Sequence, residues 1–305
     1  MANKNFAIMG VGGYIAPRHL NAIKETGNNL VAALDINDSV GILDKYFFNA
    51  DFFTEFERFD RHLEKLKAKG INIDYISICT PNYLHDAHIR FSMRIGADAI
   101  CEKPLVLNPW NLDALEELEQ KYNQKVYCIL QLRCHPAIIA LKEKIENQKK
   151  EKKKKKYKIK LKYITPRGNW YHYSWKGKLE KSGGIVTNIG IHFFDMLIWI
   201  FGDCKYYNVY NMTDKKASGI LELENASVEW ELSIDYQDLP KDCSKSTFRL
   251  ITIDDEILEF SDGFTDLHTE IYRYILSGCG FGIADCRKSI NLVYNIRNFK
   301  PNKIE

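Results

Sequence analysis

The stretch "NFAIMGVGGYIA", residues 5–16, sets the fold of the chain that follows it. Its first five residues are mostly apolar and indicate a strand. A turn with Gly10, Gly12 and Gly13 then leads into a helix expected over residues 16–26. This order is typical of a dinucleotide site, because glycines let the backbone approach a pyrophosphate and a helix N-terminus stabilises its charge. The spacing is irregular, since Ile15 stands where the usual pattern has its third glycine, and a tight glycine turn alone is the other interpretation.

Apolar strands and helices alternate through the first 130 residues. Strands are expected at 29–34, 74–79, 98–101 and 125–130, with helices at 57–69, 85–96 and 111–122. This alternation predicts a parallel, doubly wound sheet, and therefore an α/β Rossmann domain over residues 1–130. Asp35 ends the second strand, 22 residues after Gly13. A carboxylate there binds both ribose hydroxyls of NAD and repels the 2′-phosphate of NADP, so NAD is the expected cofactor.

The pattern changes after residue 156. The segment "YKIKLKYI", residues 157–164, alternates strictly between apolar and polar residues, which predicts a strand with one wet face. Further strands are expected at 206–212, 217–224, 226–235, 246–253 and 256–260, and a closing helix at 283–299. We therefore expect a second domain over residues 131–305, of the α+β class with a large, open and mostly antiparallel sheet.

Composition indicates a soluble globular protein, with 45% hydrophobic and 27% charged residues among 305. Eight cysteines without a CxxC pair, and no N-terminal signal peptide, favour a reduced, cytoplasmic protein. The longest wholly apolar run, residues 196–201, is too short to span a bilayer. Cys134 and His135 are adjacent, but nothing near them in the sequence completes a metal site, so no metal is expected.

The net charge of +3 comes from one segment. "KKEKKKKK", residues 149–156, has a net charge of +6, which leaves −3 for the rest of the chain. Such a run could bind nucleic acid or an anionic membrane. It contains no aromatic residue to stack on bases, and it joins an expected helix at 136–147 to the strand at 157. A solvated surface loop, with no nucleic-acid or membrane partner, is the favoured interpretation.

A very apolar helix carries three polar residues at helical spacing. In "NIGIHFFDMLIWIF", residues 188–201, eleven of fourteen residues are apolar or glycine. Asn188, His192 and Asp195 lie four and three apart and should share one face. A buried polar stripe costs free energy unless it finds partners. It is therefore either a satisfied internal network or a surface that faces a cleft and handles a substrate.

Two segments follow strands at the same edge of the predicted sheet. They are "CTPNYLH", residues 79–85, and "CEKPL", residues 101–105. Ligands of doubly wound sheets bind at the carboxyl ends of the strands. The residue before a proline is held extended, so Lys103 has a defined direction. Among apolar groups and beside a cationic nicotinamide it should release its proton readily, as a general base must; an ordinary surface lysine in a turn is the alternative.

These segments, in this order, resemble one known family. "GVGGYIAPRHLNAI", "TPNYLH", "EKPL" and "NIGIHFFD" look like the glucose–fructose oxidoreductase and inositol dehydrogenase (Gfo/Idh/MocA) family over essentially the whole chain. "PRHLNAIKETGNNLVAALDINDSVGILD", "FFTEFERF", "LQLR", "RGNWYHYSWKG" and "GFTDLH" resemble its WlbA/WbpB branch. That branch comprises UDP-N-acetyl-2-amino-2-deoxyglucuronate 3-dehydrogenases of bacterial surface-polysaccharide (lipopolysaccharide O-antigen) synthesis.

The resemblance implies the catalytic residues. The Glu-Lys-Pro motif of the family falls on Glu102, Lys103 and Pro104, with the lysine at the reacting centre. Its Asp-x-x-x-His dyad falls on Asn188 and His192, which is a departure, because asparagine cannot supply the negative charge that makes the histidine more basic. We therefore expect Lys103 to be the base, His192 to hydrogen-bond the sugar hydroxyl, Asn188 to orient the histidine, and this polar stripe to face the nicotinamide.

The resemblance also implies the binding residues and partners. Residues expected to bind NAD are Gly10, Gly12, Gly13, Tyr14, Ile15, Asp35, Asn37, Thr80, Pro81, Asn82, His85, Glu102, Lys103 and Gln131. Residues expected to bind a UDP-linked amino-sugar uronic acid are Lys103, Arg133, Arg167, Asn169, Trp170, Tyr171, Asn188 and His192, with Trp175 and Lys176 as further candidates; core packing is the alternative for the aromatic ones. A keto-acid co-substrate and a homotetramer are also expected. Oxidation of another sugar or cyclitol, and a non-catalytic NAD-binding regulator, are the alternative functions.

Overall fold

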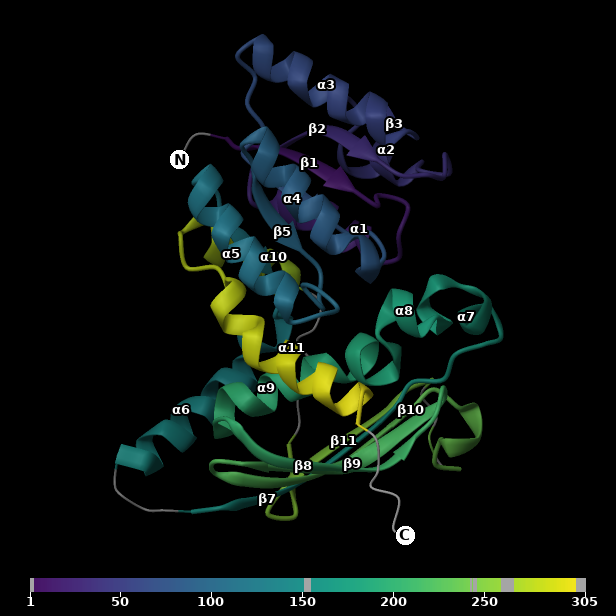
Figure 1. Ribbon diagram of the computed structural model, residues 1–305, viewed down its shortest axis with the longest axis vertical. Helices are drawn as coiled ribbons and strands as arrows, with labels where there is room; N and C mark the ends of the chain where they lie inside the picture. Colours follow the sequence, from purple (N-terminus) through teal and green to yellow (C-terminus); the bar gives the residue numbers. More distant parts are fainter. Residues whose placement is uncertain (1–2, 151–154, 242, 244–245, 259–265, 300–305) are drawn as a thin grey trace. The chain divides into compact units, whose positions relative to one another are not determined.

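The computed structural model describes residues 3–150, 155–241, 243, 246–258 and 266–299 (Figure 1). Within it the chain divides into two compact units. The first comprises Met1–Gln131 and Thr265–Cys286, and the second comprises Leu132–Phe264 and Arg287–Glu305. The sequence suggested one boundary after residue 130. It did not indicate that a later segment returns to the first unit.

The first unit is built on a six-stranded parallel sheet of order β3-β2-β1-β4-β5-β6. The predicted α/β class is confirmed. Strands such as β1 and β4 are buried on both faces, because helices cover both sides. The strand order reverses between β1 and β4, where ligands of such sheets bind. The strands are β1 (Asn5–Met9), β2 (Asn29–Leu34), β3 (Asp51–Phe53), β4 (Tyr75–Ile78), β5 (Asp98–Cys101) and β6 (Val126–Cys128), and the helices are α1 (Ala16–Glu25), α2 (Ile42–Tyr46), α3 (Phe56–Ala68), η1 (Asn82–Leu84), α4 (His85–Ile95) and α5 (Trp110–Tyr122).

The returning segment completes the core of the first unit. Helix α10 (Leu267–Leu276) packs against α1. Its Tyr272 is fully buried and stacks on Phe6 of β1, with ring centroids 5.8 Å apart. Further along, the Cys128 N–H of β6 donates a hydrogen bond to the Phe281 carbonyl at 2.8 Å. Neither α10 nor the short elements α2 and β3 were predicted from the sequence.

The second unit contains a six-stranded sheet of order β12-β11-β7-β10-β9-β8. Most neighbouring strands are antiparallel, as predicted, but β7 and β10 pair in parallel, so the sheet is mixed. Helices α6 and α9 lie on one of its faces (Figure 1). Residues alternate between buried and exposed along β7, which is the pattern of a sheet with one covered face. The elements are η2 (Gln131–Cys134), α6 (Pro136–Lys150), β7 (Tyr157–Ile164), α7 (Trp170–Tyr173), η3 (Trp175–Gly177), α8 (Leu179–Ser182), η4 (Val186–Gly190), α9 (Ile191–Phe201), β8 (Cys204–Met212), β9 (Lys216–Leu223), β10 (Ala226–Ser233), η5 (Tyr236–Asp238), β11 (Phe248–Ile253), β12 (Glu256–Ile257) and, from Arg287 onward, α11 (Ile283–Arg297).

The apolar helix of the second unit is a core element. Its helical stretch, Leu179–Phe201, is long and apolar enough by length and composition to cross a membrane, but 78% of its apolar window is buried inside the protein. Phe194 packs edge-on against Trp230 of β10, with ring centroids 5.3 Å apart. A helix that is apolar on nearly every side is expected to lie in a core.

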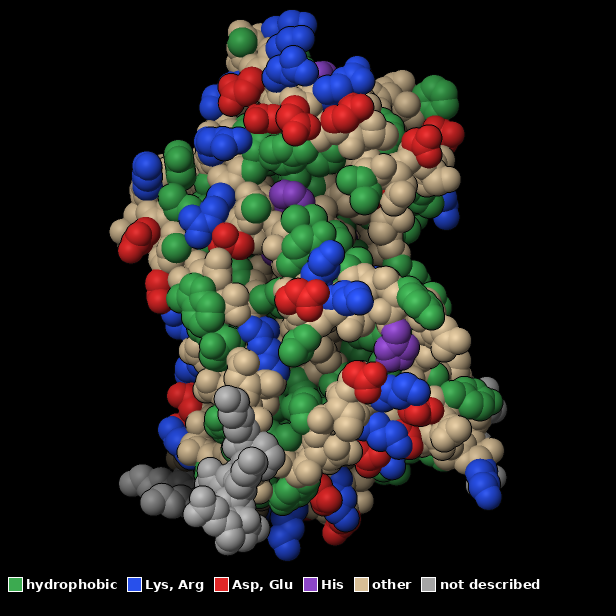
Figure 2. All heavy atoms as spheres, turned by 45° about the vertical axis from the view of Figure 1, so that its right-hand side comes forward, with side chains coloured by type: hydrophobic (Ala, Val, Ile, Leu, Met, Phe, Trp, Pro, Cys, Tyr) green, Lys and Arg blue, Asp and Glu red, His purple; other side chains and the backbone are tan. Residues whose placement is uncertain are grey.

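The lysine-rich run lies partly outside the described residues, which omit 151–154. Lys149 and Lys150 end α6. Lys155 pairs with Asp254 at 2.6 Å, and Lys156 pairs with Glu222; all four side chains are at least partly exposed. Figure 2 shows basic and acidic side chains interspersed over the face that it displays. On that face the basic side chains do not gather into one extended patch.

Candidate cofactor and substrate sites

The glycine turn after β1 brings the main chain against the loop after β4. Gly10 has a φ of +84°, and a Cβ there would lie 2.8 Å from the Cys79 carbonyl carbon, so a larger residue does not fit. The Gly13 N–H donates to the Gly10 carbonyl at 3.1 Å and closes the turn. Helix α1 follows at Ala16 without an acidic side chain in its first turn. The positive end of the helix dipole can therefore face an anion such as a pyrophosphate.

Asp35 joins this turn to the end of β2. Its Oδ2 accepts the Gly12 N–H at 2.8 Å, and its Oδ1 accepts the Asn37 N–H at 3.0 Å. A Cβ at Gly12 would lie 3.2 Å from Asp35 Oδ2, so a side chain there would press on the carboxylate. Each carboxylate oxygen has two lone pairs, so Asp35 retains acceptor capacity for the hydroxyls of a ribose.

The loops after β4 and β5 are tied together by a histidine. His85 is fully buried, and its two ring nitrogens lie 2.8 Å from the carbonyl oxygens of Pro104 and Thr80. Burial lowers the pKa of His85, although both carbonyls favour the protonated ring. The Thr80 hydroxyl is in turn 2.9 Å from His88 Nδ1. His85, which was expected to bind the cofactor, instead has both nitrogens engaged by the main chain, and it supports the two loops.

Lys103 lies at the sheet edge where the sequence placed it. It is partly exposed and precedes Pro104 across a cis peptide bond. The Glu102 N–H donates to the Ile78 carbonyl of β4 at 3.1 Å, which anchors the turn to the sheet. The other expected cofactor residues belong to the same unit. Tyr14 is 89% exposed and Asn37 is exposed, whereas Ile15, Pro81 and Gln131 are partly exposed and Asn82 is buried.

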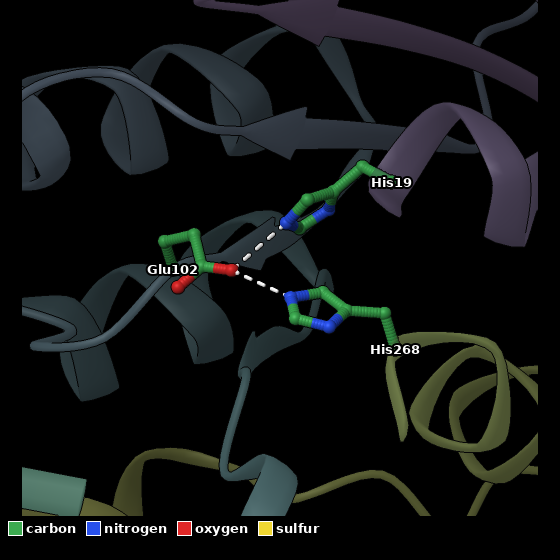
Figure 3. A group of neighbouring side chains, drawn as sticks. All are labelled: His19, Glu102 and His268. Carbon is green, nitrogen blue, oxygen red and sulfur yellow. Dashed lines mark hydrogen bonds and ion pairs between the residues drawn. The ribbon is translucent and has the colours of Figure 1, made fainter. Parts of the chain in front are cut away.

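Glu102 forms a buried network that the sequence did not reveal (Figure 3). Its Oε1 lies 3.0 Å from His19 Nε2 of α1 and 2.9 Å from His268 Nε2 of α10. The Tyr272 hydroxyl lies 2.8 Å from His19 Nδ1 and 2.6 Å from the Ser77 hydroxyl. Burial alone raises the pKa of Glu102, but the hydrogen bonds from both histidines outweigh it and hold the pKa well below its usual range.

His19, Glu102 and His268 are also the one group among the described residues whose ligand atoms lie close enough together to hold a metal ion. However, both histidine nitrogens point at the same carboxylate oxygen, at hydrogen-bond distances. An ionised carboxylate is acceptor-only, so without a bound ion each of these nitrogens donates its hydrogen to Glu102. Figure 3 therefore shows a hydrogen-bonded network around an anion.

The polar stripe of the second unit divides into two parts. Asp195 of α9 is buried, whereas Asn188 and His192 are partly exposed. A regular helix from residue 188 was predicted, but α9 begins at Ile191, and Asn188 lies in a π-helical turn, η4. Such turns are frequent at functional sites. Asn188 Nδ2 donates to the Tyr171 hydroxyl at 3.1 Å, and burial raises the pKa of Tyr171.

Arg133 belongs to the core and not to a free anion site. Its Nε and Nη2 each donate to Asp195, to Oδ2 and Oδ1 respectively, both at 2.9 Å, and the arginine is 6% exposed. The expectation that Arg133 is a substrate cation is not supported by this geometry, because a bidentate partner already neutralises its charge. Removing one partner of such a buried pair costs about 3–5 kcal/mol.

A cluster of cations and indole rings lies on the segment after β7. Lys176 Nζ is 4.5 Å from the Trp175 ring centroid and 5.8 Å from that of Trp170, which is 56% exposed. Burial, and then the charge of Arg167, lower the pKa of Lys176. Arg167 and Asn169 are exposed beside them, whereas Tyr171 is buried. An exposed indole (Trp170) and a partly exposed one (Trp175) with neighbouring cations suit a flat ring that carries phosphates.

The family of the chain emerges from sequence comparison. Residues 4–129 match the Gfo/Idh/MocA profile described as an oxidoreductase family, NAD-binding Rossmann fold, and residues 142–234 match its C-terminal alpha/beta domain. Among curated proteins, glucose-6-phosphate 3-dehydrogenase of Bacillus subtilis is 23% identical over 205 residues, which cover 65% of this chain and 54% of that protein. The chain thus spans about half the length of the curated relatives that it matches.

Solved structures provide a closer comparison. The WlbA (WbpB) dehydrogenase from Thermus thermophilus is 47% identical and superimposes with a TM-score of 0.92, over 97% of this chain. One of its structures is a complex with NAD and alpha-ketoglutarate, and the superposition covers 96% of that chain. Another is a complex with NAD and UDP-GlcNAcA, and the superposition covers 95% of that chain. The WlbA dehydrogenase from Bordetella pertussis is 18% identical, with a TM-score of 0.77 over 97% of this chain and 95% of that one, and shares the fold.

The buried histidines of the first unit predict a loss of stability in mild acid. Burial, with a contribution from His85, lowers the pKa of His88 from 6.5 to about 4. Between these values the unfolded chain binds a proton that the folded chain does not, so stability falls as the pH drops from 6.5 towards 4. Urea unfolding at pH 7 and pH 5 should show that His88→Gln recovers about 2 kcal/mol of the loss. An identical loss in the wild type and the variant would contradict this assignment.

Proposed function

Because the chain belongs to the Gfo/Idh/MocA oxidoreductase family, we propose that it oxidises a nucleotide sugar with NAD. The reaction is oxidation of the C3′ hydroxyl of UDP-N-acetylglucosaminuronic acid to the 3-keto sugar, in the synthesis of bacterial surface polysaccharide. The observation that carries this proposal is 47% identity, over 97% of the chain, to a Thermus dehydrogenase crystallised with NAD and UDP-GlcNAcA. Fold alone does not select among sugars, so the residues must support the choice.

The first unit supplies the cofactor site. Gly10 and Gly13 let the main chain approach the pyrophosphate, and the N-terminus of α1 stabilises its charge. Asp35 accepts hydrogen bonds from the ribose hydroxyls. When NAD is bound, its nicotinamide accepts a hydride. The protein's task is then to orient the sugar, exclude water and receive the proton.

Lys103 receives that proton. The C3′ carbon gives a hydride to the nicotinamide, and the hydroxyl proton passes to the neutral Lys103 amine, so that a ketone and an ammonium remain. His192 hydrogen-bonds the sugar hydroxyl, and Asn188 orients the His192 side chain. Asn188 carries no charge and donates to Tyr171. A neutral dyad does not make His192 more basic, and this favours the lysine as the base.

The second unit supplies the uridine diphosphate site. Trp170 and Trp175 offer flat faces for the uracil, and Arg167 and Lys176 offer positive charge for the diphosphate. Asn169 adds a polar side chain. Arg133 acts indirectly, since its ion pair with Asp195 holds α9, on which His192 lies.

A keto acid completes the cycle in this proposal. The Thermus relative was crystallised with NAD and alpha-ketoglutarate. Transfer of the hydride from NADH to the keto carbon, with a proton, gives a 2-hydroxy acid and restores NAD⁺ on the enzyme. We further propose a cytoplasmic homotetramer that uses the sheet face with exposed alternate residues on β7 as an interface.

Turnover with a substrate panel tests the proposed function. Purified protein incubated with NAD, 2-oxoglutarate and UDP-N-acetylglucosaminuronic acid should yield a 3-keto sugar and 2-hydroxyglutarate, detected by mass spectrometry. UDP-N-acetylglucosamine, which lacks the carboxylate, and myo-inositol should react far more slowly. Preferred turnover of a different sugar or cyclitol would replace the substrate assignment. NAD binding without turnover of any panel member would indicate a regulator.

Asp35 should select NAD over NADP. In the Asp35→Ala variant NAD should bind about tenfold to a hundredfold more weakly, because one good hydrogen bond to a charged acceptor is worth about 1.5–3 kcal/mol. NADP should bind no more weakly than before, since its 2′-phosphate no longer meets a negative charge. Fluorescence titration of both cofactors measures the two dissociation constants. Equal affinities for NAD and NADP in the unmodified protein would exclude this role.

Lys103 and His192 should differ in their effect on rate. Lys103→Met should lower kcat by about 10²–10⁴-fold while NAD still binds, because the base is lost and the pyrophosphate and ribose contacts remain. His192→Asn should lower it by about tenfold to a hundredfold, as one hydrogen bond to the hydroxyl weakens. The effects should not multiply in the double variant if both groups act on the same proton. Near-normal turnover in Lys103→Met together with an inactive His192→Asn would reverse the two roles.

A further inference from the structure

Glu102 directly precedes the proposed base and is unusual for a surface-loop carboxylate. It is 7% exposed, although it lies at the carboxyl edge of the sheet. One oxygen, Oε1, faces His19 and His268, as described above. The other oxygen, Oε2, lies 3.3 Å from the main-chain nitrogen of Lys103 and accepts its N–H. The same carboxylate therefore contacts two remote helices and the backbone of the lysine.

The protonation states of the network follow from its contacts. Both histidines can remain neutral if each donates its Nε2 hydrogen to Glu102. His19 Nδ1 then accepts the Tyr272 hydroxyl hydrogen, and the Tyr272 oxygen accepts the Ser77 hydroxyl hydrogen. Burial lowers the pKa of His268, which favours this neutral state. The network thus holds one negative charge, and every member of it has a partner.

Packing alone does not account for this arrangement. Burying a carboxylate costs several kcal/mol, and apolar side chains of similar volume are often more stabilising in such places. What the carboxylate provides, and an apolar group cannot, is an acceptor for the Lys103 N–H. The Pro104 carbonyl, on the other side of the lysine, is held by His85. The main chain at Lys103 is therefore held on both sides.

We propose that Glu102 is a positioning residue for Lys103, held in place by His19 and His268. Its hydrogen bond to the Lys103 N–H fixes the main chain from which the lysine side chain projects, so that the amine is presented in one place. His268 makes the returning segment, residues 266–286, part of this support. The role rests on the proposed function of Lys103 as base. It requires no contact between Glu102 and the substrate.

Steady-state kinetics test the role. Glu102→Gln should lower kcat about tenfold to a hundredfold, because a misplacement of the lysine amine by about 1 Å costs that much. In a Lys103→Met background the same change should alter the residual rate by less than about twofold. Glu119→Gln is the matched control, because Glu119 also accepts a backbone N–H, from Val126 at 2.7 Å, in the same unit. It should leave kcat unchanged.

A pair of variants at His268 tests the support separately. His268→Gln keeps an N–H donor, whereas His268→Leu does not. The glutamine should retain kcat within about threefold of the wild type, and the leucine should resemble Glu102→Gln. If Glu102→Gln fails to fold, which circular dichroism would show, this pair decides the matter. Equal losses of kcat in the two His268 variants would overturn the proposal.

Amide hydrogen exchange tests the main-chain bond without substrate. In Glu102→Gln a single amide oxygen remains, and with both histidines on it the NH2 group replaces the oxygen that accepts the Lys103 N–H. The Lys103 amide should then exchange about tenfold faster than in the wild type, while the amides of β4 are unchanged. Unaltered exchange at Lys103 would overturn the proposal, as would an equal loss of rate in the wild-type and Lys103→Met backgrounds. If the wild type turns over no panel substrate, the proposed function fails, and exchange at Lys103 still reports whether Glu102 holds its main chain.

Discussion

A carboxylate removed from water must be surrounded by hydrogen-bond donors, and in the first unit this requirement falls on Glu102. The donors come from α1, from α10 and from the next peptide of its own chain. The helix that follows the glycine turn, the segment that returns from beyond residue 264, and the turn that carries Lys103 are thereby joined at one charge. Loss of any one donor would leave a buried anion short of partners.

Local sequence patterns were sufficient to predict the first sheet. Contacts between residues far apart in the sequence could not be predicted from them. Its strands are buried apolar segments separated by helices, and this alternation can be recognised from residues that are close together in the sequence. The return of α10 depends on contacts such as His268 with Glu102, which are 166 residues apart. Nothing in the local sequence around His268 marks it as a partner of Glu102. The parallel pairing of β7 with β10 was missed for a related reason. Alternation of apolar and polar residues shows that a strand has one solvent-exposed face, but it does not show the direction in which the strand runs relative to its neighbour.

The polar stripe of the second unit shows how far helical spacing can be used. Spacings of four and three correctly placed Asn188, His192 and Asp195 on one helical segment, but the two interpretations of the stripe apply to different members. Asp195 is a satisfied internal group that pairs with Arg133. Asn188 and His192 are partly exposed, as a substrate-handling role requires. The sequence could not separate the two roles, because it does not show that Asp195 already has Arg133 as a partner.

The uncharged Asn188 bears on where the proton goes in the proposed reaction. Asn188 supplies no negative charge, so the proposed function assigns acceptance of the proton to Lys103 of the first unit. Glu102, one residue away, is held as an anion by its two histidine partners. An oxidised nicotinamide bound by the same unit would add a positive charge there, and its reduction in the proposed reaction would remove that charge. In the proposed reaction, the fixed charge of Glu102 and the changing charge of the cofactor would therefore both act on Lys103.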